Sequence, residues 1–550
     1  MIQYENLGFA LEEWAGCLSP ENVSVEVETL DRYARSSSAN PRRPAAVLRP
    51  GSTDQVVAII QVARRHRVPL YPISTGLNWG YGDACAVFPG QVIVDLGRMN
   101  GLEIDRELGY AVIEPGVTQE QLAEALDQSG APFWMDCTGA SPRSSLIGNV
   151  LERGFGHTPY GNRLLTISGL EVVLGTGAVV RTGFGHFASS RSTHVFPYGV
   201  GPYIDGLFTQ SNYGIVTRAG LWLLPRPESF RPFLCFFAED EDFERCIAPL
   251  RELRMQRVLH SVVHVANDLR AIAGERSFPR ESVPSAARLP DHVRRALRRH
   301  YGIGAWTLTG AFYGPSAQVS IQERLLRRAL SGARVRVITL SERKLKLLRR
   351  CAPAVERTRF LRRYSPKIRA ALSLAGLLGG RPTPAFLKGS YWRRRDGIPQ
   401  GLTTCDPAAD GCGILWLTAV LPFRAMDFRR LCAALDDVFM RHGFDCLTTL
   451  NMINERALVA IVTVAFDASD AQEAQRATAC HRAAMLRCIA DGYPPYRAGI
   501  GVMDLLGSGE EPFWVAAESL KHALDPDRVI APGRYQPGFL AGCKVAGRPT

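Results

Sequence analysis

The amino-acid sequence lacks the features that mark membrane-spanning, secreted and zinc-binding proteins. No apolar run approaches the ~20 residues needed to cross a bilayer, and the N-terminal stretch MIQYENLGFALEEWAG is acidic and polar, unlike a secretory signal. The thirteen cysteines are scattered without a Cys-x-x-Cys pair, and no His/Cys cluster has zinc spacing. We therefore expect a cytoplasmic protein with reduced thiols, no membrane partner and no metal.

Acidic residues are fewer than basic ones, which gives a formal net charge of +12. Much of the basic charge lies within residues 324–395, in segments such as SERKLKLLRR and YWRRRD. Two interpretations are open: a patch for nucleic acid or an anionic membrane, or a set of solvated helix faces. The charges alternate with Leu, Ala and Phe at helical spacing, and no aromatic residues are interleaved for base stacking. We favour solvated faces and keep a nucleic-acid- or membrane-binding protein as a remote alternative.

The length and the residue pattern predict an α+β protein with more than one domain. The chain has 550 residues, 46% of them apolar, which is enough for two or more cores. From residue 44, short strands alternate with amphipathic helices at 53–66 and 117–130, for which Thr53 and Thr118 are the expected N-caps. Residues 170–181 predict a hairpin, and Pro225 and Pro227 mark a domain boundary. We expect domains over residues 1–228 and 229–493, followed by a C-terminal segment over 494–550.

The most informative segment is residues 72–82, PISTGLNWGYG, which lies between two apolar runs. Its three glycines and small polar residues allow a sharp turn whose N–H groups point into one concavity. Such a nest binds diphosphate, although the spacing is neither that of the dinucleotide fingerprint nor that of the P-loop. An ordinary loop remains the alternative explanation of this segment alone.

Five ordered segments together resemble the vanillyl-alcohol oxidase/p-cresol methylhydroxylase superfamily of flavoproteins, and most closely its 4-alkylphenol-oxidising branch. They are PISTGLNWGYG, AVIEPGV at 111–117, IGNVLERGFGHTPYG at 147–161, FPYGVGPYIDGLFTQSNYGIV at 196–216 and DPDRVIAPG at 525–533. The resemblance implies a two-subdomain FAD-binding domain, to which residues 494–550 return, and a separate α+β cap domain that binds substrate. It also implies that FAD is held by Ser74, Thr75, Gly76, Leu77, Asn78, Gly80, Gly148, Asn149, Gly154, Gly214, Ile215 and Val216.

Three matched positions carry the resemblance to the phenol-oxidising branch. They are Tyr81, Tyr496 and Arg497, which the resemblance implies bind a phenolate. A permanent cation and two phenolic O–H donors favour a deprotonated phenol, and electron release from the phenolate assists loss of a benzylic hydride to the flavin, giving a p-quinone methide. We therefore expect an FAD-dependent oxidase or dehydrogenase of a small para-substituted phenol, which could serve a biosynthetic cyclisation or dehydrogenation. A family member that oxidises a hydroxy acid, sugar lactone or alkaloid is the alternative.

Two departures from the family pattern affect the chemistry. The branch commonly has an Asp near flavin N5, and the segment after Asp136 lacks an acidic residue, so His157 or Arg143 is a candidate replacement. The cap strand expected to carry a flavin-linking His holds Val459 and Ala460 instead, which predicts non-covalent FAD. Either O2 or another acceptor could reoxidise the flavin, and by analogy with the family we expect a homodimer.

Overall fold

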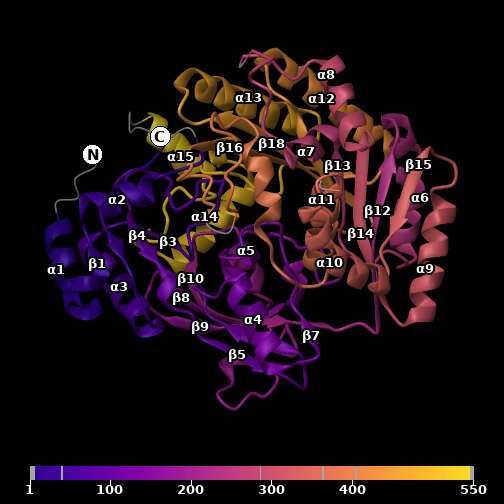
Figure 1. Ribbon diagram of the computed structural model, residues 1–550. Helices are drawn as coiled ribbons and strands as arrows, with labels where there is room; N and C mark the ends of the chain where they lie inside the picture. The colour runs from indigo at the N-terminus through magenta and orange to yellow at the C-terminus, as the bar shows by residue number, and fades with distance from the viewer. Residues whose placement is uncertain (1–5, 39–40, 285, 362–363, 403–404, 546–550) are drawn as a thin grey trace.

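The computed structural model describes residues 6–38, 41–284, 286–361, 364–402 and 405–545. It is a mixed helix and sheet structure with two sheets in the N-terminal part and one large sheet in the middle of the chain (Figure 1). The expected α+β class is confirmed.

The first sheet is small and partly parallel, with the strand order β1-β2-β4-β3. β2, β4 and β3 run parallel, since helix α3 connects β2 to β3. The N-cap of α3 is Ser52, whose hydroxyl accepts from the Gln55 amide, and not Thr53 as expected, because Thr53 already has helical geometry. The elements are α1 (Leu7–Leu18), β1 (Val23–Ser24), α2 (Val27–Ala34), β2 (Val47–Leu48), α3 (Thr53–His66), β3 (Leu70–Ile73) and β4 (Val92–Asp95).

The second sheet is antiparallel and has the order β5-β6-β10-β8-β9. The predicted hairpin is confirmed as β8 and β9, and Thr118 forms the expected capping box with Gln121 at the start of α4. The elements are β5 (Leu102–Asp105), β6 (Tyr110–Ile113), α4 (Gln119–Ser129), β7 (Phe133–Trp134), α5 (Leu146–Leu151), β8 (Ile167–Leu174), β9 (Val179–Arg181), β10 (Gly214–Trp222) and β11 (Leu224–Pro225).

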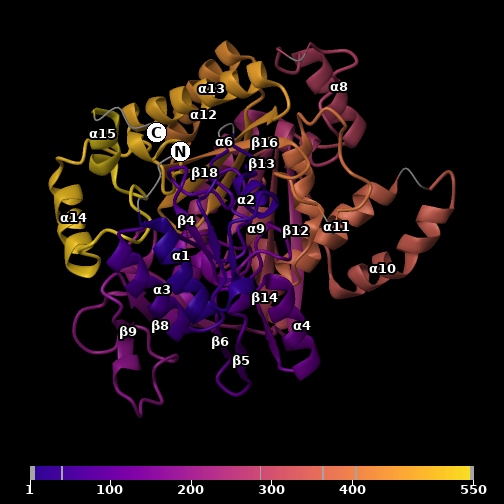
Figure 2. The ribbon, with the colours of Figure 1, turned by 90° about the vertical axis from the view of Figure 1, so that its left-hand side faces the viewer.

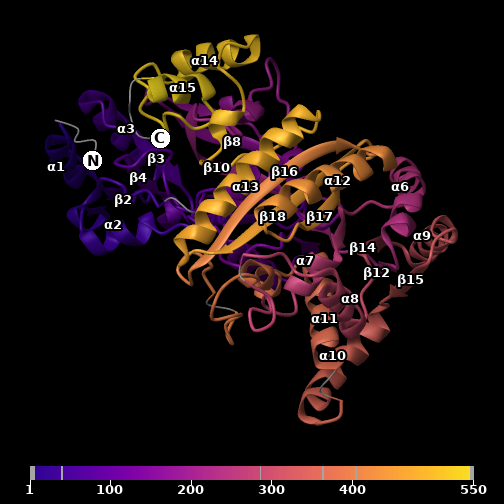
Figure 3. The same cartoon turned by 90° about the horizontal axis from the view of Figure 1, so that it is seen from above.

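Residues 229–490 build a seven-stranded antiparallel sheet of order β15-β12-β14-β13-β17-β18-β16, flanked by helices (Figures 1 and 3). The strands are β12 (Ser229–Phe237), β13 (Val263–Asn267), β14 (Trp306–Gly314), β15 (Val335–Thr339), β16 (Cys412–Pro422), β17 (Leu447–Met452) and β18 (Ala457–Asp467). The helices are α6 (Asp240–Met255), α7 (Asp268–Ala273), α8 (Asp291–Tyr301), α9 (Ser316–Ala329), α10 (Glu342–Arg357), α11 (Ser365–Leu378), α12 (Ala425–His442) and α13 (Ala471–Ala490).

The two faces of this sheet differ in character because side chains alternate along each strand. One face carries fully buried residues such as Leu417, Ala460 and Val462, and α6, α9, α12 and α13 pack on this sheet. The other face carries Trp416, Thr418 and His264, whose contacts reach the N-terminal domain and the C-terminal segment. This second face forms the roof of the candidate site.

The basic stretch lies mostly on α9, α10 and α11, and the last two helices project from the sheet (Figures 2 and 3). Helix α10 buries Leu345 and exposes Arg343, Lys346 and Arg350, as expected for a solvated helix face. Arg362 and Arg363 of the same stretch lie outside the described residues.

The C-terminal segment packs against the first sheet. Leu70 of β3 forms a parallel bridge with Ile530, and buried Lys521 donates to the carbonyl oxygens of Asn212 and Ile530 and to Asp525. Helices α14 (Pro512–Leu524) and α15 (Pro537–Val545) therefore lie beside the N-terminal elements (Figure 2). Among the described residues no helix is both long and apolar enough to span a bilayer.

Candidate active site

The glycine-rich loop follows β3 and is held by contacts with the preceding chain. Gly76 and Gly80 have φ values of 69° and 77°, in the left-handed region that glycine tolerates. The Ser37 hydroxyl accepts from the Gly80 amide at 2.7 Å, and the Asp83 carboxylate accepts from the Ser37 amide at 2.8 Å. A Cβ added at Gly80 would lie 2.1 Å from Cδ1 of Trp416 on the roof, so only glycine fits there.

The glycine-rich loop has backbone N–H groups without an acceptor in the described part of the chain, as a diphosphate-binding loop needs. Among the described residues, the backbone N–H groups of residues 75–79 donate to no protein acceptor. Part-buried amides without partners on consecutive residues form an anion-binding concavity. The loop therefore suits the diphosphate of a nucleotide cofactor.

A second predicted segment meets this loop. The Ser145 amide donates to the Thr75 hydroxyl at 3.3 Å, and a Cβ at Gly148 would lie 2.6 Å from Oγ of Ser74. Asn149 holds the following turn, where Gly154 donates to the Asn149 carbonyl at 2.8 Å. The structure thus brings together two of the three predicted cofactor-binding segments. The third, residues 214–216, begins β10 and pairs with β8.

Tyr81, Tyr496 and Arg497 converge although they are far apart in sequence. The guanidinium carbon of Arg497 lies 3.8 Å from the centroid of the Tyr81 ring, and the guanidinium donates to Asn78 of the glycine-rich loop. The Thr418 hydroxyl on the roof donates to the Arg497 carbonyl at 2.7 Å, and the Tyr496 amide donates to the Thr418 carbonyl at 3.0 Å. Strand β16 therefore positions both C-terminal residues over the loop.

Burial keeps both tyrosines in the protonated form. Desolvation raises the pKa of Tyr81 well above its usual value, and the Arg497 cation opposes this only in part. Desolvation likewise raises the pKa of Tyr496. Both phenols therefore remain O–H donors at neutral pH beside a permanent cation, a donor set that suits an oxyanion.

Sequence reasoning missed Glu152, a buried carboxylate beside this cluster. It caps the C-terminus of α5, and its Oε2 lies 3.1 Å from Nε of Arg497. Arg534 also pairs with Glu152, and the Tyr535 hydroxyl donates to it at 3.2 Å. A carboxylate inside the glycine-rich segment IGNVLERGFG was the available sequence signal.

Asp136 and Arg143 have structural partners instead. The Asp136 carboxylate accepts from Arg163 at 2.8 Å and from the amide and hydroxyl of Thr158, which fixes the loop that carries His157. Arg143 donates to the Cys405 carbonyl at 3.2 Å. Neither is in contact with the tyrosine–arginine cluster among the described residues.

His157 lies against another part of the roof, where its ring stacks on His264 of β13. The two imidazole centroids are 3.7 Å apart and the rings are inclined by 17°. Burial, together with the smaller effect of the Arg163 cation, lowers the pKa of His157 to about 3. His264 was not predicted, since only the strand register places this lone histidine on the roof.

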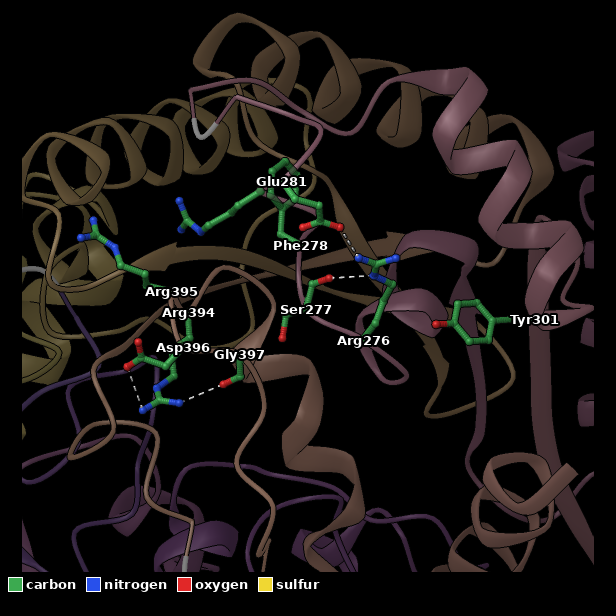
Figure 4. Close-up of a pocket in the computed structure, with 10 residues that line it drawn as sticks. Arg276, Ser277, Phe278, Glu281, Tyr301, Arg394, Arg395, Asp396 and Gly397 are labelled. Carbon is green, nitrogen blue, oxygen red and sulfur yellow. Dashed lines mark hydrogen bonds and ion pairs between the residues drawn. The ribbon is translucent and has the colours of Figure 1, made fainter. Parts of the chain in front are cut away.

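One cavity borders the tyrosine–arginine cluster and another lies in the cap. The first, of ≈ 40 Å³, is bordered by Gly80, Tyr81 and Arg482. The other, ≈ 410 Å³, lies within residues 229–490, and its lining includes arginines that already have partners, such as Arg276 with Glu281 and Arg394 with Asp396 (Figure 4). The larger cavity is separate from the predicted residues. No group of His, Cys, Asp and Glu suited to a metal ion occurs among the described residues.

The chain is similar over almost its whole length to named flavoproteins. It is 33% identical to the 1'-carboxy-chondrochloren decarboxylase of Chondromyces crocatus over 96% of each chain. It is 29% identical to the 4-cresol dehydrogenase (hydroxylating) flavoprotein subunit of Pseudomonas putida, over 96% of this chain and 94% of that one. Residues 44–183 match the family model of an FAD binding domain.

Solved structures show the same fold. A structure of p-cresol methylhydroxylase with substrate bound matches with a TM-score of 0.85 and 28% identity, covering 97% of this chain and 98% of that one. A 4-ethylphenol oxidase from Gulosibacter chungangensis, in an isoeugenol complex, matches with a TM-score of 0.86 at the same identity and coverage.

The two-subdomain FAD-binding fold with its separate cap and the matched cofactor domain define an FAD-dependent oxidoreductase. The chain belongs to the vanillyl-alcohol oxidase/p-cresol methylhydroxylase family of flavoproteins, so the expected family, fold and cofactor are confirmed.

Proposed function

We propose that this flavoprotein oxidises a small para-substituted phenol. The phenol oxygen binds as phenolate to Arg497 and to the hydroxyls of Tyr81 and Tyr496. The observation that carries the proposal is the convergence of these three groups, with Arg497 3.8 Å from the Tyr81 ring centroid. FAD held by the predicted cofactor residues would supply the acceptor for the benzylic hydride, so that the phenolate bound by Tyr81, Tyr496 and Arg497 would become a p-quinone methide.

The FAD-binding residues remain those the resemblance implies, and we propose that the flavin is held without a covalent bond. The amides of residues 75–79, which have no acceptor among the described residues, would cradle the diphosphate. Gly148, whose own amide donates to the Ser145 hydroxyl, would allow a close approach because it has no Cβ. Asn149, Gly154 and residues 214–216 would complete the cofactor site.

Glu152 is the carboxylate best placed to move a proton in this site. It lies against Arg497 and is largely excluded from water, so it can take the phenol proton as the phenolate forms. The family commonly uses an Asp near flavin N5, and the segment after Asp136 lacks this residue. We assign the proton-transfer role to Glu152 instead. Of the two earlier candidates, Arg143 donates to the Cys405 carbonyl, and His157 would lie along the substrate's side chain.

The test is anaerobic titration of the purified protein with a panel of 4-alkylphenols and 4-hydroxybenzyl alcohols. Bleaching of the flavin absorbance near its visible maximum supports the proposal, and no bleaching with any member contradicts it. Re-oxidation of the reduced flavin by O2, followed by stopped flow, separates an oxidase from a dehydrogenase. Size-exclusion chromatography tests the expected homodimer.

Oxidative decarboxylation is a second candidate, favoured by the 33% identity to a protein named as a decarboxylase. If the carbon next to the benzylic carbon carries a carboxylate, its C–C bond can break in the quinone methide. The bond's electron pair forms the alkene and restores the phenolate, CO2 leaves, and the flavin holds the hydride. Release of one CO2 per reduced flavin would distinguish this reaction from hydroxylation.

A further inference from the structure

Two imidazoles from different domains meet at the roof of the site. His157 comes from the loop that Asp136 fixes, and His264 comes from β13, where it lies opposite Asn451 of β17. The loop is tied to β13 because the Val262 amide donates to the Thr158 carbonyl at 3.3 Å. The stack of His157 on His264, with centroids 3.7 Å apart, is therefore a fixed part of the domain boundary.

Polar atoms in this cluster lack well-aligned partners. Nδ1 of His157 is inaccessible to solvent and has no hydrogen-bond partner among the described residues. Nε2 of His264 and Oδ1 of Asn451 are also inaccessible, and although Asn451 lies beside His264, neither atom makes a well-aligned hydrogen bond with a described residue. Leaving one such group unpaired costs about 1–3 kcal/mol, so native proteins rarely keep several together without a reason. A ligand group that pairs with them would recover this cost.

The cluster needs hydrogen-bond donors. The Gly156 backbone and the Asn451 side chain each raise the pKa of His264. A group that favours the protonated ring in this way accepts a hydrogen bond from it, so both are acceptors beside His264. Burial and the neighbouring His157 lower the pKa of His264, so the neutral ring has one N–H for two acceptors. A carboxylate would add further lone pairs, whereas a hydroxyl or amide N–H supplies the missing proton.

Aromatic side chains lie between this cluster and the phenolate-binding residues. The Phe155 ring lies 6.0 Å from the Tyr496 ring and 6.2 Å from the His264 ring, and Phe386 packs 6.4 Å from His157. These ring-to-ring distances fit a substrate whose phenol end lies at Tyr496 and whose para side chain passes along Phe155.

We propose that His157, His264 and Asn451 form a specificity site for an uncharged hydrogen-bond donor, a hydroxyl or amide N–H, at the end of the substrate's para side chain. The inference rests on the proposed function, since it takes the phenol end to bind at Tyr81, Tyr496 and Arg497. It adds a substrate class, namely 4-alkylphenols with a polar, uncharged side-chain terminus.

The experiment measures dissociation constants of three phenols by anaerobic calorimetry with the FAD-loaded protein whose flavin has been chemically reduced beforehand, so that no turnover occurs. They are 4-propylphenol, 4-(3-hydroxypropyl)phenol and 3-(4-hydroxyphenyl)propanoate, which differ only at the terminus. We expect the alcohol to bind about 10-fold tighter than 4-propylphenol, and the carboxylate to bind more weakly than both. Equal binding of the alcohol and 4-propylphenol, or tightest binding of the carboxylate, overturns the inference.

Variants locate the effect. In His157→Phe and His264→Phe the preference for the alcohol over 4-propylphenol, measured within the same variant, should fall to about 1-fold. His260→Phe is the matched control, since His260 is exposed, and melting temperature and flavin content report folding. A preference that survives in both folded variants overturns the site, and the wild-type comparison decides if neither variant folds.

The same experiment separates this inference from the proposed function. If 4-propylphenol itself fails to bind, the proposed function fails; if it binds and the alcohol binds no tighter, only this inference fails.

Discussion

Arg497 lies over the ring of Tyr81, with its guanidinium carbon 3.8 Å from the ring centroid. The two residues are more than four hundred positions apart, and the contact forms because Thr418 of the cap sheet holds the Arg497 backbone. The cap thus contributes to the phenolate-binding site by positioning a residue of the C-terminal segment.

Arg497→Met should weaken the binding of a 4-alkylphenol by about 10- to 100-fold, because it removes a charge-assisted bond worth about 1.5–3 kcal/mol. Tyr81→Phe and Tyr496→Phe should each weaken binding by about 10-fold. The dependence of the rate of anaerobic flavin reduction on phenol concentration, followed by stopped flow, measures these constants. Tyr493→Phe is the matched control, since its hydroxyl donates to Asp427 in the cap. Unchanged constants in all three site variants would refute the phenolate site.

Glu152→Gln should lower the limiting rate of anaerobic flavin reduction by about 100-fold or more, because the amide cannot take the phenol proton. The dissociation constant of the phenol should change little or fall, since a negative charge is removed beside Arg497. Stopped-flow measurement over a range of phenol concentrations separates the two constants. If Glu152 serves only to pair with Arg497 and Arg534, the variant will lose melting temperature and affinity while keeping its rate.

The sequence predicted the parts of this site that local patterns encode. Glycines in residues 72–82 and the capping pattern at Thr118 are local signals, and the fold uses both. The register of the cap strands is not local, so nothing in the sequence placed His264 on the same face as Trp416 or opposite Asn451. Asp136 shows the converse: its partners Thr158 and Arg163 become visible only once the loop is folded around it.

Gly80→Ala should destabilise the protein by about 2 kcal/mol or more and reduce its flavin content. Alanine is strained at a φ of 77°, and its Cβ would collide with Trp416. Thermal unfolding and the ratio of visible to ultraviolet absorbance measure both effects. Gly16→Ala is the control, because a Cβ there meets nothing within 4 Å inside helix α1, so stability should rise slightly.

Asp83 should make the stability of the protein depend on pH between about 4 and 7. Burial raises the pKa of its carboxyl from 3.8 to about 7, against the hydrogen bonds from Ser36 and Ser37. In this range the folded state keeps a proton that the unfolded state has lost, so the contribution present below pH 3.8 is lost as the pH rises through about 7.

Asp83→Asn tests this directly because the amide cannot titrate. Between pH 5 and pH 8 the wild type should lose about 2 kcal/mol of unfolding free energy relative to the variant. Urea unfolding at the two pH values measures the difference. Asp54→Asn, at an exposed position on α3, should show no such shift, and an equal shift in both variants would contradict the assignment to Asp83.

Acid denaturation should release the flavin into the supernatant. Of the two residues at the expected linking position, Ala460 faces the core under the cap helices and Val459 lies opposite Asn451 on the roof. Valine has no nucleophilic atom, so this strand offers no attachment point to the flavin. Buried Cys137 lies beside the His157 loop, since the His157 amide donates to the Cys137 carbonyl, and burial raises the pKa of the Cys137 thiol far above neutrality. Yellow colour retained on the precipitate would show a covalent bond, and Cys137→Ser would then test whether that thiol forms it.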